Sequence, residues 1–219
     1  VRANKEILIE RGATLWKLSA PAYFSRPGET VDFSFLPQGG GTTAATNRPA
    51  HWEILRLEDR ASSKGLLANV ATANTAANTV RLDFQKAGSY TVSLKDANGN
   101  LVVATSHWVS GEGLKAIPGS VEIVFDKEAY RAGVKAEALI TFPHPVSNAL
   151  LTLERDKVET HALLAGKADW VNISQITPSQ WKAKIPVKSD YGPNITFSVL
   201  YLNNGDYVFQ NKGLRVAVP

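Results

Sequence analysis

The sequence contains no cysteine and no methionine in its 219 residues. Without cysteine there are no disulfide scaffolds, cysteine–zinc sites or thiol nucleophiles, although the composition fits a periplasmic protein as well as a cytosolic one. Because not even an initiator methionine is present, we expect an excised or processed piece of a longer protein. The N-terminal residues lack signal-peptide anatomy. No apolar run approaches the roughly 18 residues that a membrane helix needs, so we expect no direct membrane insertion.

The chain also lacks a strong charge of one sign. Its formal net charge is +4, and the excess is spread thinly, without a block of about five or six like charges. We therefore expect a solvated basic surface and no nucleic-acid partner. With 44% hydrophobic and 20% charged residues, the chain is able to bury a real core and is not of the disordered class.

What the sequence does contain is short β-rich runs, many of them alternating apolar and polar residues, while helical periodicity is hard to find. Turn residues separate the runs at intervals of about 8–12 residues, which is typical of a β-sandwich. The sequence therefore predicts an all-β fold of two tandem immunoglobulin/fibronectin-III-like sandwiches. The expected strands lie in 30–35, 51–57, 79–84, 89–95, 101–105, 120–126, 136–142, 148–156, 157–166, 169–177, 181–187, 194–202 and 207–210.

The boundary between the two sandwiches is expected within residues 109–120. Three glycines and a proline interrupt the apolar pattern there, and we expect few buried contacts from this segment. The predicted domains are 1–117 and 118–219. Within the first, the polar stretch 36–49 is interpreted as a long surface loop, and 69–79 as a loop or an irregular edge strand.

A phrase near the start of the chain recurs about a hundred residues later. When Gly28 is aligned with Gly133, Arg26 falls over Arg131. The apolar residues that follow also match in position, and the pairs are Val31 with Ala136, Phe33 with Ala138, and Phe35 with Ile140. This repetition indicates a chain that builds the same scaffold twice.

No group of residues predicts catalysis, a metal site or a cofactor site. The four histidines are far apart in sequence and never at metal-ligand spacing, so we interpret them as surface or strand-face residues: His51, His107, His144 and His161. A nucleophile elbow, a phosphate loop and a dinucleotide fingerprint are absent. The pairs Glu58-Asp59 and Glu154/Asp156 lie beside strand ends and are interpreted as solvated charges. The sequence predicts a binding or structural module, not an enzyme.

The stretch 96–100 resembles the start of a calcium loop through Asp96, Asn98 and Asn100. An EF-hand would then need glycine and glutamate where the chain has Leu101 and His107. We therefore predict a hairpin turn at Asn98-Gly99 instead.

Aromatic residues leave an alternative open. Each of the five tryptophans lies within or beside an apolar strand pattern, so the core is favoured over an exposed platform for sugars or bases: Trp16, Trp52, Trp108, Trp170 and Trp181. Two glycosylation acceptors, at Asn172 and Asn194, would matter only in a eukaryotic secretory context.

The stretch 125–161 resembles a phrase of bacterial alpha-2-macroglobulins. The matching features are Asp126-Lys127, Tyr130, Gly133, a turn from Phe142 to Pro145, and the run from Leu150 to Asp156. Pro193-Asn194 and the final "GLRVAVP" resemble later strand entries of the family. In the first domain, "RPGETV" and "SHWVSGEG" give weaker support.

The resemblance implies two tandem macroglobulin-like sandwiches without catalytic residues, within a large periplasmic protein. Such a protein acts as a broad-spectrum protease trap that protects the cell: a protease cuts an exposed bait segment and the protein rearranges around it. Implied partners are neighbouring domains of the parent chain and, through the parent, target proteases. Anchoring of the parent at the inner membrane stays open.

The thioester of the family needs a Cys-x-Glu-Gln motif, which this chain does not contain. Stretches 36–49 and 69–79 are loose enough to be cut, but ordinary strand-connecting loops explain them better than a bait segment. The alternative hypothesis is a cell-surface adhesin or carbohydrate-binding tandem of Ig-like domains, in which exposed tryptophans and loop tips would bind the ligand.

Overall fold

The computed structural model describes residues 14–38, 47–67, 78–114, 116 and 118–217. These residues form strands β1 to β16 and one 3₁₀ helix, η2 (Ser189–Tyr191), with no α-helix among them. The chain divides into two compact units. Unit 1 comprises Val1–Ala20, Asp32–Leu82 and Thr91–Ser106, and unit 2 comprises Pro21–Val31, Asp83–Tyr90 and His107–Pro219. In the described part of the chain, no helix has the length and hydrophobicity needed to cross a bilayer.

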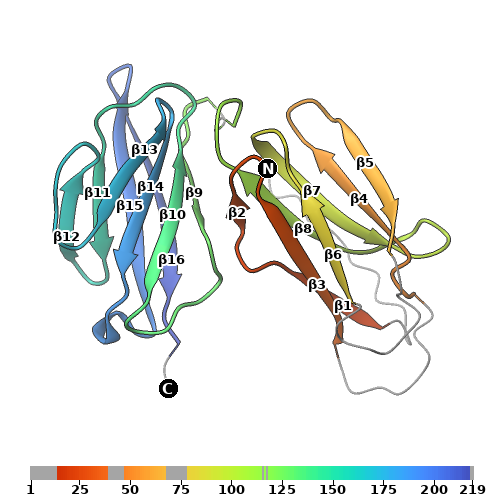
Figure 1. The fold of residues 1–219 in the computed structure, drawn as a ribbon. Helices are drawn as coiled ribbons and strands as arrows, with labels where there is room; N and C mark the ends of the chain where they lie inside the picture. The colour runs from red at the N-terminus through yellow and green to blue at the C-terminus, as the bar shows by residue number, and fades with distance from the viewer. Residues whose placement is uncertain (1–13, 39–46, 68–77, 115, 117, 218–219) are drawn as a thin grey trace. The chain divides into compact units, whose positions relative to one another are not determined.

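The first half of the chain contributes two sheets (Figure 1). One has the strand order β1-β3-β6 and contains β1 (Leu15–Ser19), β3 (Thr30–Gln38) and β6 (Thr79–Asp83). The other has the order β2-β8-β7-β4-β5 and contains β2 (Phe24–Ser25), β4 (His51–Arg56), β5 (Ser62–Leu66), β7 (Gly88–Lys95) and β8 (Leu101–Val109). Alternation of buried and less buried residues along β3 and β7 gives each strand one core-facing side.

Unit 2 contains a sandwich of two four-stranded antiparallel sheets. The first sheet, in the order β13-β14-β10-β9, contains β9 (Glu122–Phe125), β10 (Lys135–Thr141), β13 (Asn172–Thr177) and β14 (Gln180–Pro186). The second, in the order β12-β11-β15-β16, contains β11 (Leu150–Glu154), β12 (Val158–Leu163), β15 (Asn194–Asn203) and β16 (Asp206–Arg215). Along the first sheet, β9-β10-β14-β13 occupy the A-B-E-D places of an immunoglobulin-like sandwich. Along the second, β11-β15-β16 occupy the C-F-G places, with β12 added next to β11. The predicted all-β, immunoglobulin-like fold is confirmed.

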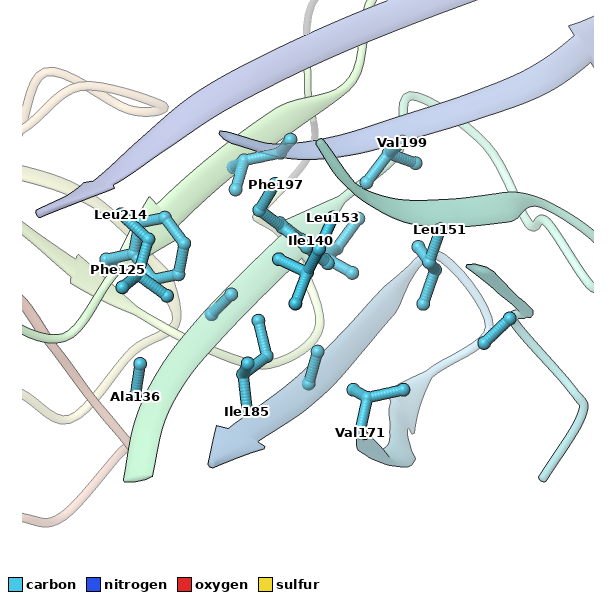
Figure 2. Close-up of a cluster of buried hydrophobic side chains, with 14 of the residues drawn as sticks. Phe125, Ala136, Ile140, Leu151, Leu153, Val171, Ile185, Phe197, Val199 and Leu214 are labelled. Atoms are coloured by element: carbon cyan, nitrogen blue, oxygen red, sulfur yellow. The ribbon is translucent and has the colours of Figure 1, made fainter. Parts of the chain in front are cut away.

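The core of this sandwich is made by alternate residues of both sheets (Figure 2). Ala136, Ile140 and Ile185 come from the first sheet, and Leu151 and Phe197 from the second. All are fully buried. Because successive side chains of a strand point to opposite faces, the residues between them form the outer faces of the two sheets.

The repeated phrase folds into the same turn twice. In the first copy the amide of Glu29 donates to the carbonyl of Arg26, and in the second the amide of Val134 donates to Arg131. Gly28 and Gly133 have φ values of 82° and 87°, a backbone region that favours glycine. Each turn leads into a strand, β3 or β10, whose aligned apolar residues are buried.

Several details differ from the expectation. Strands β1, β2 and β5 were not predicted, and Leu57 is exposed just after β4 instead of continuing its buried side. Strand β3 extends through Gln38 and β6 begins at Thr79, so the edges of both predicted loops are strand. Most of the remainder of those loops, residues 39–46 and 69–77, lies outside the described residues.

Candidate functional site

The polar residues that could do chemistry do not converge in the described part of the chain. No group of three or more histidine, aspartate or glutamate side chains there is placed to hold a metal ion. His51 lies half-buried on β4 and His161 is exposed on β12. The exposed His144 has its ring nitrogens 3.1 Å from the Pro145 carbonyl and 3.0 Å from the Asn203 side-chain oxygen. These positions agree with the predicted surface and strand-face roles.

His107 is the exception among the histidines, because its side chain is only 1% exposed. Its Nε2 lies 2.9 Å from the Ser25 hydroxyl, and its ring stacks on Phe84 with centroids 4.9 Å apart. Burial lowers the pKa of His107 to about 4, since a charged imidazolium is poorly solvated in this environment. The residue therefore packs as a neutral aromatic ring of unit 2.

The turn at 96–100 is a hairpin connection, as predicted. The carboxylate of Asp96 accepts hydrogen bonds from the amides of Asn98 and Asn100 and from the Asn100 side chain, at 2.9, 2.9 and 3.0 Å. The bonds from Asn100 are the largest influence on Asp96 and lower its pKa. The carboxylate oxygens therefore stabilise the turn by accepting hydrogen bonds from donors within the turn itself.

Three of the four residues in the two carboxylate pairs have local partners. Glu58 and Asp59 both form ion pairs with Arg56, at 3.8 and 2.7 Å, and Glu154 accepts a hydrogen bond from the Thr152 hydroxyl. Neither arrangement is a pair of carboxyls facing a common cleft, which acid–base catalysis would require.

None of the five tryptophans belongs to the exposed class. Trp170 and Trp181 lie in the unit 2 core, where their indole nitrogens donate to the carbonyls of His161 and Val146 at 3.0 and 3.1 Å. Trp16, Trp52 and Trp108 are half-buried. Buried indoles whose N–H groups donate to backbone carbonyls have a structural role. This favours the core interpretation over a sugar-binding platform.

Polar residues around the second copy of the phrase form a partly buried hydrogen-bond network at the start of β10. The Tyr130 hydroxyl donates to Asp126 at 2.5 Å, and the same carboxylate accepts from the Glu137 amide at 2.8 Å. Burial, with Asp126 nearby, raises the pKa of Tyr130, so the phenol stays a donor. This network fixes the loop between β9 and β10.

One outer sheet face of unit 2 is covered. Val124 of β9 and Leu139 of β10 are cross-strand partners that point away from the sandwich core. Leu114 joins them in a buried cluster, and half-buried aromatic rings pack against it: Tyr23, Phe24 and Trp108. We call this the covered face. Its covering residues come from the segments 21–31 and 107–114, outside the strands of the sandwich.

The predicted linker 109–120 is therefore wrong in one respect, because it contributes buried contacts. Val109, Ser110, Leu114 and Ala116 are all buried. The Gly111 amide donates to the side-chain oxygen of the fully buried Gln180 at 2.6 Å. Isolated apolar residues among glycines and polar residues gave little sequence signal for this packing. The domain boundary itself stays a prediction.

The outer face of the other sheet carries six apolar residues, of which four are exposed and two, Leu150 and Leu200, are half-buried. Leu163, Leu150, Leu200 and Phe209 are successive cross-strand partners on β12, β11, β15 and β16, and Leu202 pairs with Tyr207 in the next outward row. We call these six residues the open face. All of these residues except Phe209 line a groove of about 450 Å³, together with Tyr201 and the segment 144–149.

The open face was not predicted, although the sequence holds a signal for it. Residues 199–202 read "VLYL", so both sides of β15 are apolar there. Alternation, which marks a strand with one side in water, is lost. An uninterrupted apolar run in an antiparallel strand is a sign that both of its sides meet other protein.

Two family models match this chain and together follow its two halves. The model of bacterial alpha-2-macroglobulin Ig-like domain 4 matches residues 14–112, and that of the alpha-2-macroglobulin bait region domain matches residues 121–219. The chain is also 48% identical, over 221 aligned residues, to an alpha-2-macroglobulin of Ralstonia nicotianae. The chain belongs to the bacterial alpha-2-macroglobulin family.

The alpha-2-macroglobulin match covers 100% of this chain but 14% of the Ralstonia relative. Among solved structures, the chain is similar to the native conformation of E. coli alpha-2-macroglobulin, with 13% identity, a TM-score of 0.37, and coverage of 88% of this chain and 13% of that one. A titin Z1Z2 tandem chimera is similar over 93% of this chain and 100% of its own, with 15% identity and a TM-score of 0.32.

Within the alpha-2-macroglobulin family, the two models follow the strand groups closely. The Ig-like domain 4 match spans β1 to β8, and the bait region domain match spans β9 to β16. The resemblance of residues 125–161 to the family is confirmed. The open face and the outward residues Val124 and Leu139 of the covered face belong to the part matched by the bait region domain.

Proposed function

We propose that this chain is a non-catalytic scaffold section of a longer bacterial alpha-2-macroglobulin, which acts as a periplasmic, broad-spectrum protease trap protecting the cell. The observation that supports this most is the 48% identity to an alpha-2-macroglobulin along the full length of the chain. The chain's contribution is to hold and orient other parts of the parent, and inhibition belongs to the parent protein.

The scaffold role agrees with the physics of trapping by rearrangement. Such a mechanism needs rigid bodies that move relative to one another without unfolding. Unit 2 has the features of such a body: a continuous apolar core, the Tyr130–Asp126 hydrogen bond and the Gly111–Gln180 hydrogen bond. The chain carries no cysteine, so a thioester, if the parent uses one, is formed by residues elsewhere.

The adhesin or carbohydrate-binding alternative receives less support. It would use exposed tryptophans as a stacking surface, whereas Trp170 and Trp181 are buried and the other three are half-buried. Acrylamide quenching of tryptophan fluorescence should accordingly be weak.

The test uses the full-length parent protein, mixed with an equimolar general protease. Trapping predicts that cleavage of a large protein substrate falls sharply while cleavage of a small peptide substrate continues, because only the large substrate is kept from the enclosed protease. The matched control is the 219-residue chain alone, which should neither inhibit nor accelerate either reaction. Unchanged cleavage of the large substrate by the parent would contradict the trap, and clear inhibition by the short chain would contradict the scaffold role.

A further inference from the structure

The open face is too apolar to be an ordinary water-exposed sheet surface. Tyr207, Leu202 and Phe209 are 75, 62 and 52% exposed, and their neighbours in register extend the apolar row across all four strands. Single exposed apolar residues are common on protein surfaces, but contiguous groups of them beside a groove mark interaction sites.

The covered face is a second apolar outer face of the same sandwich, and there the apolar residues are buried. Val124 and Leu139 are outward-pointing apolar partners like Leu150 and Leu200, and they are buried under Leu114 and its aromatic neighbours. Those covering residues belong to the same chain but lie outside the strands of the sandwich. An apolar outer face is thus covered here by another part of the polypeptide.

The groove beside the open face points to the same kind of occupant. Its lining residues, from His144 to Ala149 and on the four strands, include no aspartate, glutamate, lysine or arginine. Permanent interfaces have apolar, charge-poor centres, whereas transient ones are about as polar as ordinary surface. A lasting contact inside one protein fits this composition better than a passing encounter with a protease.

We propose that the open face is the docking surface for an apolar, uncharged surface of another domain of the parent chain. This inference rests on the proposed scaffold role. The chain corresponds to 14% of the length of its Ralstonia relative, so a parent of that size has ample further chain to supply the partner. Docking buries Tyr207, Phe209 and Leu202 in the resting parent, before any protease is bound.

The test is hydroxyl-radical footprinting of the full-length parent at rest, read by peptide mass. Two matched pairs within unit 2 calibrate it: Tyr207 against the 3% exposed Tyr201, and Phe209 against the fully buried Phe197. Docking predicts that labelling of Tyr207 falls to the level of Tyr201, and labelling of Phe209 to that of Phe197. Labelling of Tyr207 and Phe209 well above their buried partners would overturn the proposal.

A substitution adds an independent readout. Phe209→Asp in the parent should raise labelling of Tyr207, because a carboxylate on the open face loosens the docked domain. Leu101→Asp is the control, since Leu101 is an exposed leucine on β8 outside the open face, and it should leave Tyr207 protected. Unchanged labelling of Tyr201 and Phe197 in both variants shows that the sandwich is still folded.

Other occupants give different results and would each overturn the proposal. Protection of Tyr207 that disappears on dilution indicates a second copy of the chain, and protection that appears only after protease is added indicates the protease. The docking test is also independent of the trap assay. If Tyr207 is protected at all dilutions but large substrates are still cleaved, the docking inference stands and the proposed function is wrong. If cleavage of large substrates falls but Tyr207 is labelled strongly, the proposed function stands and the docking inference is wrong.

Discussion

Protonation of His107 provides a quantitative test of how tightly unit 2 is packed. The ring is 1% exposed, and burial lowers its pKa from 6.5 to about 4. Between these two values the unfolded chain binds a proton that the folded chain does not. The contribution of His107 to stability is therefore fully present above pH 6.5 and is lost as the pH falls toward 4.

The expected magnitude follows from the two pKa values, 6.5 and about 4. Their difference corresponds to about 3 kcal/mol of unfolding free energy lost by pH 4, of which about 2 kcal/mol is lost by pH 5. Carboxyl groups with lowered pKa values, such as Asp32 and Asp96, also lose stability in acid. Their unperturbed value is 3.8, so most of their effect lies below pH 5, and measurements at pH 7 and pH 5 isolate the histidine.

The assay is urea unfolding of the 219-residue chain at both pH values, for the wild type and for His107→Gln. The wild type should lose about 2 kcal/mol more than the variant between pH 7 and pH 5. His161→Gln is the control because His161 is exposed, and it should keep the wild-type pH dependence. The reasoning is refuted if His107→Gln loses as much stability as the wild type, or if the His107 ring titrates near pH 6.5 by NMR.

Two further substitutions test close contacts. Gln180→Leu should destabilise the chain by about 1–3 kcal/mol in urea unfolding, because the Gly111 amide, which donates to Gln180 at 2.6 Å, loses its buried acceptor. Gly65→Ala should cost about 1–3 kcal/mol through overpacking, since a Cβ atom there would lie 2.5 Å from the Trp52 ring, and a shift of tryptophan fluorescence should accompany it.

Each of these has a matched control. Gln175→Leu changes an exposed glutamine on β13 and should leave stability nearly unchanged. Gly213→Ala adds a Cβ atom with no neighbour within 4 Å and should be close to neutral. If a control variant proves as destabilising as its test variant, then the particular contact is not the cause.

The strands of the second half were predictable because their residues repeat a simple rule. Each of the strands β9 to β15 lies wholly or mostly within one predicted run, because alternating apolar residues separated by turn residues favour strands. Only β16 (Asp206–Arg215) extends well beyond its predicted run, 207–210. Of the strands that were missed, β2 and β5 lack this pattern. Strand β5 reads "SSKGL", and its glycine is explained only by the Trp52 ring that lies over it.

Packing outside the strands was harder to predict. Leu114 is one apolar residue in a segment rich in glycine, and nothing in its neighbours shows that it meets Val124 and Leu139. The Gly111–Gln180 bond joins positions 69 residues apart, a separation at which local pattern carries no information. The open face was missed for a different reason. Alternation of apolar and polar residues marks the buried side of a strand, whereas "VLYL" is apolar on both sides.

The two outer faces of unit 2 follow from one physical requirement. A sandwich needs only the inward side of each strand to be apolar, so outward leucines and aromatics add nothing to its own core and lower its solubility. Val124 and Leu139 avoid exposure to water because Leu114 covers them. Leu202, Phe209 and Tyr207 are exposed, and no described residue covers them. Under the proposed scaffold role, a chain without catalytic residues would retain such side chains because they hold a second domain in place.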